Sequence, residues 1–328
     1  MHDVASSRTP ARAGLVPKLI VGAAAAATLL PGVSAGAALI AGIVLGLTVG
    51  NPWPARTPAL ARRALAWSVV GLGAGMNLAV VAHVGLQGLG YTAIGLSCAF
   101  VVGTLAGRLL AIGPDVSLLI TVGTAICGGS AIAAVGPVIR AEDHDMSMAL
   151  VAVFLLNAVA LFLFPAIGHH LHLAQHAFGL WCALAIHDTS SVVAAAAQYG
   201  PRALAVATAG KLARALWIVP VTVGIAALRA RETDDGTGTA SRVKYPWFIA
   251  GFVAVSALVT FVPALSGSGH VVARLAQQAL AATLFLMGLG LSRPMLRTLG
   301  ARPFLHAVTL WFVLATTTLG AILLGWIH

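Results

Sequence analysis

The sequence predicts an all-α integral membrane protein built from two inverted repeats, with about 9–11 membrane segments. Its composition is the first indication: 59% of the 328 residues are hydrophobic and only 9% are charged, whereas soluble domains carry about 25% charged residues. The second is that apolar runs follow one another along the chain, most of them near the ~20 residues that a helix needs to cross the hydrocarbon. The third is that two runs are interrupted by small and polar residues, which predicts two broken or re-entrant helices.

Short polar connections separate the apolar runs. Residues 1–17 are polar and predict a disordered cytoplasmic tail. The first run, 19–31, has the composition of a membrane span, although its basic start also resembles a cleaved signal peptide. The longest polar connection, 229–245, predicts a cytoplasmic loop. The later runs are 34–50, 62–78, 88–112, 116–139, 147–167, 177–199, 203–228, 246–263, 271–291 and 303–327.

The run at 116–139 is interrupted by the stretch Gly123–Pro137, which reads GTAICGGSAIAAVGP. An opened helix leaves backbone groups unpaired, and in lipid it persists only where protein or a water-filled cavity surrounds it. The pattern recurs 60 residues later, where AIHDTSSVVA at 185–194 echoes AICGGSAIAA at 125–134. We therefore expect a ligand site where the two interruptions meet.

A second echo relates Gly73–Leu78 to Gly288–Arg293. The two echoes predict a duplication, with a first repeat over 18–167 and a second over 168–328. Two arrangements are open: both interrupted runs cross fully, or both are re-entrant and leave nine full spans. Inverted repeats favour the re-entrant arrangement.

Loop charge predicts the orientation. Loops without Lys or Arg lie near 32–34, 79–87 and 264–270. Basic loops belong in the cytoplasm, so we expect a multi-pass protein of the bacterial inner membrane with a cytoplasmic N-terminus. The basic positions are the tail, Arg56, Arg62, Arg63, Arg108, the 229–244 loop, Arg293, Arg297 and Arg302.

Lys211 and Arg214 are the most informative charges. They lie well inside an apolar segment, roughly 13–18 Å deep, and their spacing puts both on one helix face. A charge at that depth needs a partner or a polar cavity. One interpretation is that the pair binds an anion. The other is a structural ion pair, with Asp188 as the partner.

The first interruption supplies a candidate half of the site. Gly128, Gly129 and Ser130 would open the helix and begin a half-helix whose N–H groups attract an anion. Close packing through small residues is the alternative. Thr124 belongs to the same stretch, and Cys127 borders it, although core packing explains that cysteine equally simply.

The second interruption supplies the other half. Thr189, Ser190 and Ser191 repeat the arrangement of small hydroxyl-bearing residues. His187 and Asp188 adjoin each other inside an apolar run, where the imidazole could couple protons to transport or could simply be a neutral hydrogen-bonding group.

Two asparagines lie outside the interruptions. Asn77 is a candidate ligand at a span end, with a helix cap as the alternative. Asn157 lies in the middle of a span and predicts a hydrogen bond between helices.

Several classes of function are disfavoured. Basic patches with interleaved aromatic residues are missing, so we expect no nucleic-acid partner. The three cysteines lie inside apolar segments without metal-ligand spacing, so we expect neither a disulfide framework nor a metal site. Catalytic motifs such as H-E-x-x-H and G-x-S-x-G are missing, and no enzyme activity is expected.

The ICGGSAI run at 126–132, the His187-Asp188 pair, the GMNL stretch at 75–78 and Lys211-Leu212-x-Arg214 resemble the YeiH-type family of UPF0324 membrane proteins, described as sulfate exporters. The resemblance covers about 18–327. It implies a likeness to the bile-acid and arsenite class of secondary transporters, which have inverted repeats and crossed broken helices. An acidic residue, often Glu, follows the His in the family, and here that position holds Asp188.

The resulting hypothesis is a secondary transporter of a small anion, sulfate or a related sulfur oxyanion or sulfonate, working by alternating access. The substrate and the lipid bilayer are its expected partners, with a homodimer left open. No cofactor is expected, and H⁺ or Na⁺ are candidate coupling ions. A passive anion channel lined by the same broken helices is the alternative function.

Overall fold

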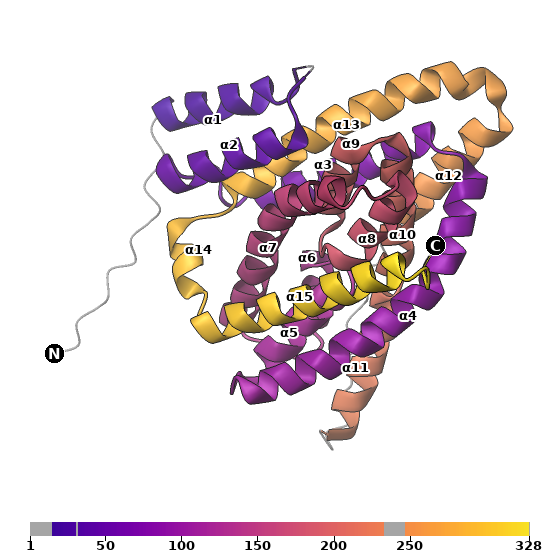
Figure 1. The fold of residues 1–328 in the computed structure, drawn as a ribbon. Helices are drawn as coiled ribbons and strands as arrows, with labels where there is room; N and C mark the ends of the chain where they lie inside the picture. Colours follow the sequence, from indigo (N-terminus) through magenta and orange to yellow (C-terminus); the bar gives the residue numbers. More distant parts are fainter. Residues whose placement is uncertain (1–14, 31, 233–246, 328) are drawn as a thin grey trace.

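We describe a computed structural model that covers residues 15–30, 32–232 and 247–327. Within these ranges every regular element is a helix (Figure 1). The predicted tail lies outside the described residues up to position 14, and its last three residues already belong to the first helix. The predicted 229–245 loop lies outside them from position 233 onward.

The described chain confirms an all-α membrane protein. Five helical stretches are long and apolar enough to cross a membrane, and four shorter helices are also apolar. The elements are α1 (Leu15–Ala27), α2 (Ala35–Thr48), α3 (Thr57–Leu72), η1 (Gly73–Gly75), α4 (Leu78–Leu109), α5 (Pro114–Ala125), α6 (Gly129–Val135), α7 (Asp143–His170), α8 (Gln175–Ala185), α9 (Thr189–Tyr199), α10 (Pro201–Ala215), α11 (Ile218–Glu232), α12 (Trp247–Phe261), η2 (Pro263–Leu265), α13 (Ser266–Leu289), α14 (Arg293–Thr298) and α15 (Ala301–Leu323).

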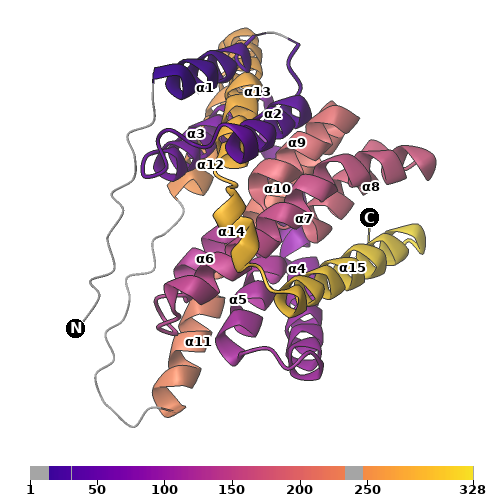
Figure 2. The same cartoon turned by 90° about the vertical axis from the view of Figure 1, so that its left-hand side faces the viewer.

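The helices form two bundles (Figure 2). The first, which we call the α13 bundle, contains α1, α2, α3, α12 and α13. The second, the hairpin bundle, contains α4 to α11 and α15. Contacts between the bundles are sparse and run mainly from α2 and α13 to α7 and α9, and from α12 to α4.

Close backbone approach holds α2 against α13. A Cβ atom added to Gly42 would lie 2.2 Å from the carbonyl oxygen of Phe285, and one added to Gly288 would lie 2.6 Å from that of Leu39. Membrane helices associate through such small residues because lipid provides no hydrophobic drive between them. Gly288, the first residue of the Gly288–Arg293 echo, is therefore one of the small residues that let α2 and α13 pack closely.

The first interrupted run folds back on itself. α5 ends at Ala125, α6 begins at Gly129, and Gly128 between them has φ +69°, a conformation that favours glycine. A Cβ added to Gly123 would lie 2.9 Å from the side chain of Ile132. In a continuous helix these two positions would be roughly 13 Å apart along the axis, so α5 and α6 form a hairpin.

The second interrupted run is also a hairpin. α8 ends at Ala185 and α9 begins at Thr189. The chain leaves α9 beside the start of α8: a Cβ added to Gly200 would lie 2.4 Å from Gln175, whose Oε1 accepts the backbone N–H of Arg202 at 3.0 Å. The two ends of this hairpin therefore lie side by side.

The two hairpins enter from opposite ends of the span formed by α10 and α11, 201–229. The α8–α9 hairpin starts beside Arg202, at the beginning of that span. The α5–α6 hairpin starts at Asp115, which forms an ion pair with Arg229 at the other end. The hairpin tips therefore lie in the middle of the bundle, which is the geometry that the re-entrant arrangement predicts; the number of membrane spans stays a prediction.

Two details of the sequence expectation differ from the structure. The run at 203–228 is not one helix, because a turn at 216–217 separates α10 from α11. Pro220 lacks the N–H that would bond the carbonyl of residue 216, which explains the turn. The halves 18–167 and 168–328 also differ in element order, with four helices before the first hairpin and none before the second, so the repeat boundaries stay a prediction.

Candidate functional site

Two buried cations lie where the hairpin tips meet. Lys211 is 0% exposed and Arg214 is 2% exposed, and both come from α10. The Lys211 Nζ donates hydrogen bonds to the carbonyl oxygens of Ile126, at 2.9 Å, and Ile186, at 2.7 Å. One ammonium group thus joins the tips of both hairpins at positions 60 residues apart.

Arg214 makes the same kind of connection one turn further along α10. Its Nε donates to the carbonyl of Ala125 at 2.6 Å and its Nη2 to that of Thr124 at 3.0 Å, both at the end of α5. Its Nη1 donates to the carbonyls of Ala183 and Leu184 near the end of α8.

These contacts supply hydrogen-bond donors to the carbonyl groups at the ends of α5 and α8. The last carbonyls of a helix have no partner within the helix and carry the negative end of its dipole. Two such ends converge inside the bundle, where unpaired backbone groups cost several kcal/mol each. The two cations supply the missing donors and the opposite charge, so they hold α5 and α8 end to end.

The tips also touch each other directly. A Cβ added to Gly128 would lie 3.5 Å from both Cα and Cβ of Asp188. These two residues are also 60 positions apart. The local echo in the sequence therefore corresponds to paired positions in space.

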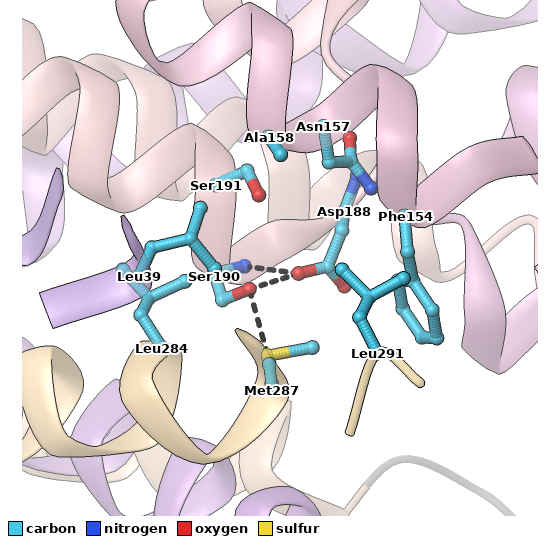
Figure 3. A pocket seen from close by; sticks show the side chains of 10 residues that line it. All are labelled: Leu39, Phe154, Asn157, Ala158, Asp188, Ser190, Ser191, Leu284, Met287 and Leu291. Carbon is cyan, nitrogen blue, oxygen red and sulfur yellow. Dashed lines mark hydrogen bonds between the residues drawn. The ribbon is translucent and has the colours of Figure 1, made fainter. Parts of the chain in front are cut away.

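A small pocket lies beside the tips, at the border between the two bundles (Figure 3). Its volume is about 20 Å³, which is room for about one water molecule. The hairpin bundle contributes the polar side and the α13 bundle contributes an apolar wall. The lining residues are Leu39, Phe154, Asn157, Ala158, Asp188, Ser190, Ser191, Leu284, Met287 and Leu291.

Asp188 organises the polar side of the pocket. It is the N-cap of α9, and its Oδ2 accepts the backbone N–H of Ser190 at 3.0 Å and the Ser190 hydroxyl (Figure 3). The Ser190 hydroxyl also lies 3.3 Å from the sulfur of Met287, across the border between the bundles. The Asp188 N–H donates to Asn157 Oδ1 at 3.2 Å.

Of the predicted site residues, the structure brings Asp188, Ser190 and Ser191 into the pocket lining. Thr189 follows Asp188 as the first residue of α9. Lys211 and Arg214 face the tip carbonyls instead of the pocket, and Lys211 forms no ion pair with Asp188. The alternative interpretation, a structural ion pair between Lys211 and Asp188, is therefore not what the structure shows, because helix-end carbonyls accept the hydrogen bonds of the ammonium group.

The predicted residues of the first interruption lie beside the tips but do not line the pocket. Gly128 and Gly129 form the turn into α6, and the Cys127 sulfur lies 3.3 Å from the Ser130 hydroxyl. Ser130 is exposed, whereas its echo partner Ser190 is 0% exposed.

Four of the ten buried side-chain polar atoms that have no partner among the described residues belong to residues at or beside the tips. Both ring nitrogens of His187, the hydroxyl of Thr124 and the Nδ2 of Asn157 have none among the described residues. His187 itself is 0% exposed. Such atoms are rare in proteins, and strain, a functional role or a bound water or ion can account for them.

Asn77 lies elsewhere. It caps α4, and its Oδ1 accepts the N–H of Ala79 at 2.8 Å. The structure thus gives this residue the helix-cap role, and it is not part of the pocket lining.

The sequence-based site set omitted Asn157 and Met287. Asn157 forms the predicted hydrogen bond between helices and also lines the pocket. Its polar amide in the middle of an apolar span is the sequence feature that could have marked it as a site residue. No sequence feature marks Met287 as a pocket residue, because its position in the lining depends on how α13 packs against α9.

The sequence is similar to those of other membrane proteins. The sequence profile of a family described as "Conserved hypothetical protein 698" matches residues 14–307. A UPF0324 membrane protein of Bdellovibrio bacteriovorus is 56% identical over 287 residues, which is 87% of each chain. Another, from Geobacter sulfurreducens, is 44% identical over 86% of this chain and 88% of the relative. No solved structure matches the chain.

Proposed function

Because the chain belongs to the UPF0324 family of membrane proteins, we propose that it is a secondary transporter of a small anion. Sulfate, another sulfur oxyanion or a sulfonate is the proposed substrate, carried across the bacterial inner membrane by alternating access. The observation that supports this best is the meeting of two oppositely oriented hairpin tips at a buried cationic pair, beside a pocket between two bundles.

Two re-entrant hairpins that meet in the middle of a bundle suit a carrier. Secondary transporters bind substrates near the midplane with discontinuous helices, and one bundle moves against the other around the site. Here the contacts between bundles are sparse and the apolar wall of the pocket comes from the other bundle. Movement of α2 and α13 away from α9 would enlarge a pocket that now has room for about one water molecule.

The donors for an anion come from α9 and α7. The first turn of α9 offers backbone N–H groups and the hydroxyls of Ser190 and Ser191, and Asn157 adds an Nδ2 that has no partner among the described residues. Helix N-termini favour anions through these N–H groups and the helix dipole. Lys211 and Arg214 add positive charge behind the tips without direct contact.

Asp188 is the proposed coupling residue. Its carboxylate occupies the N-terminus of α9 and would repel an incoming anion. Binding of H⁺ or Na⁺ at this carboxylate would cancel its charge and release the Ser190 donors. Anion and cation would then bind together, which couples their transport.

The test is anion flux in proteoliposomes loaded with sulfate, sulfite, thiosulfate or a sulfonate. We expect saturable uptake and counterflow that respond to an imposed pH or Na⁺ gradient. Asp188→Asn should abolish the response to the gradient while exchange of anion continues. Asp115→Asn is the matched control, because Asp115 lies at the far end of α5 in a pair with Arg229.

Two outcomes would contradict the proposal. Flux that does not saturate and shows no counterflow would indicate a passive channel. Gradient-driven flux that is unchanged in Asp188→Asn would remove this residue from the coupling mechanism.

A further inference from the structure

A groove separate from the pocket opens where three helices of the hairpin bundle begin. Helix α4 starts at Leu78, α8 at Gln175 and α10 at Pro201. The volume of the groove is about 550 Å³, within the usual range for small-molecule sites. Its lining residues are Ala79, His83, Val84, His176, Arg202, Ala205 and Val206.

The groove combines an apolar floor with nitrogen-bearing side chains. The aliphatic residues of α4 and α10 form the floor, and each of the three helices contributes one basic side chain: His83, His176 and Arg202. Helices α4, α8 and α10 contain no Asp or Glu. The surface of the groove itself is almost wholly apolar and gains from contact with an apolar group, and the exposed cation Arg202 beside it favours an anionic one.

The groove lies at the end of the membrane-spanning segments. Arg202 is the second residue of the 201–229 span, and the groove is lined only by residues of the first two turns of α4, α8 and α10. Below it α4 and α10 close together, since a Cβ added to Gly210 would lie 3.8 Å from Val84. Lys211 follows directly after that contact, so the groove is closed toward the hairpin tips.

We propose that this groove binds an anionic phospholipid. Its phosphate would contact Arg202 and the two histidines, and part of an acyl chain would cover Val84, Ala205 and Val206. Basic pockets between membrane helices bind lipid head groups on the cytoplasmic or matrix side, and the same contact between phosphate and cation is available at the opposite surface. A small hydrated anion would leave most of this volume and the aliphatic floor without contacts, which is why a lipid is the better occupant.

The test is native mass spectrometry of the detergent-purified full chain, titrated with phosphatidylglycerol or with neutral phosphatidylcholine. We expect binding of phosphatidylglycerol at least tenfold tighter than of phosphatidylcholine. Arg202→Gln and the double variant His83→Gln/His176→Gln should each weaken phosphatidylglycerol binding at least fivefold. Ala79→Trp, which fills the groove and keeps its charges, should weaken it similarly.

Arg274→Gln is the matched control, because Arg274 is an exposed cation of α13 outside the groove, and it should bind like the native chain. Equal binding by all groove variants and the native chain would overturn the proposal. It would also be overturned if inorganic phosphate alone bound with comparable affinity and displaced the lipid, because the groove would then be a site for the free oxyanion.

Discussion

The burial of Lys211 and Arg214 determines what these two residues can do. Lys211 and Arg214 are too deep to remain without partners, and the sequence predicts that much. It does not predict which partners they take, because the carbonyls at the ends of α5 and α8 become available only when both hairpins fold. The structure makes these residues positioning groups for the tips, and any direct contact with substrate stays a prediction.

Replacement of Lys211 should loosen the tips. Lys211→Met removes two hydrogen bonds from a charged donor and leaves two buried carbonyls without it. Hydrogen bonds to charged groups contribute about 1.5–3 kcal/mol each, so we expect a loss of roughly 3 kcal/mol in the free energy of unfolding. Thermal unfolding followed by labelling of the buried thiols Cys127 and Cys182 measures the change.

Lys211→Arg is the comparison that keeps the charge, and it should recover part of the stability. Arg274→Met removes an exposed cation of α13 and should leave the unfolding temperature unchanged. A Lys211→Met protein as stable as the native chain would show that the ammonium group does not hold the tips.

At the scale of elements, the sequence predicts that two helices are interrupted, but it does not predict whether the chain crosses or folds back there. Glycine, serine and polar residues at 126–130 and 187–191 marked both interruptions, and each helix does end there. Loop charge could not distinguish a crossing from a hairpin, because that choice depends on contacts such as Gln175 with Arg202. Pro220 is a sequence feature that could have predicted the turn after α10. It does not require one, because proline is also tolerated in the first turn of a helix.

The close contact of α2 with α13 gives a prediction for the α13 bundle. Gly42→Val places methyl groups where the carbonyl of Phe285 now lies. Overpacking typically costs about 1–3 kcal/mol, and backbone contact leaves little room for adjustment. We expect a clear fall in unfolding temperature or in the yield of folded protein, measured by fluorescence-detected size-exclusion chromatography on heated samples.

Gly22→Val is the matched control within the same bundle, because a Cβ at Gly22 of α1 meets nothing within 4 Å. If both variants unfold alike, the cost comes from valine in a helix and not from the contact between α2 and α13.

At the scale of the molecule, the two hairpins are related in position but differ in exposure. Ser190 on α9 is covered by Met287 of the α13 bundle, whereas Ser130 on α6 is exposed. The α13 bundle thus covers Ser190 and leaves Ser130 uncovered. Sequence alone could not predict this difference, because it depends on how two bundles with few mutual contacts lie against each other.

Thiol labelling tests this difference. In a chain with its three native cysteines replaced, Ser130→Cys should react readily with a membrane-impermeant maleimide added from one side. Ser190→Cys should react at least tenfold more slowly. If the proposed alternating access is right, a substrate gradient should raise the Ser190→Cys rate, because the α13 bundle would then move away from α9. Equal rates at rest would contradict the exposure difference.

The single ammonium group that joins Ile126 to Ile186 has a mechanical consequence. Separation of the tips would leave the Lys211 ammonium group without its two carbonyl partners in a nonpolar interior, so we expect the two tips to stay together. In the proposed transporter, a substrate would then pass beside the tips and not between them. The wall it would pass is the one that carries Leu284 and Met287.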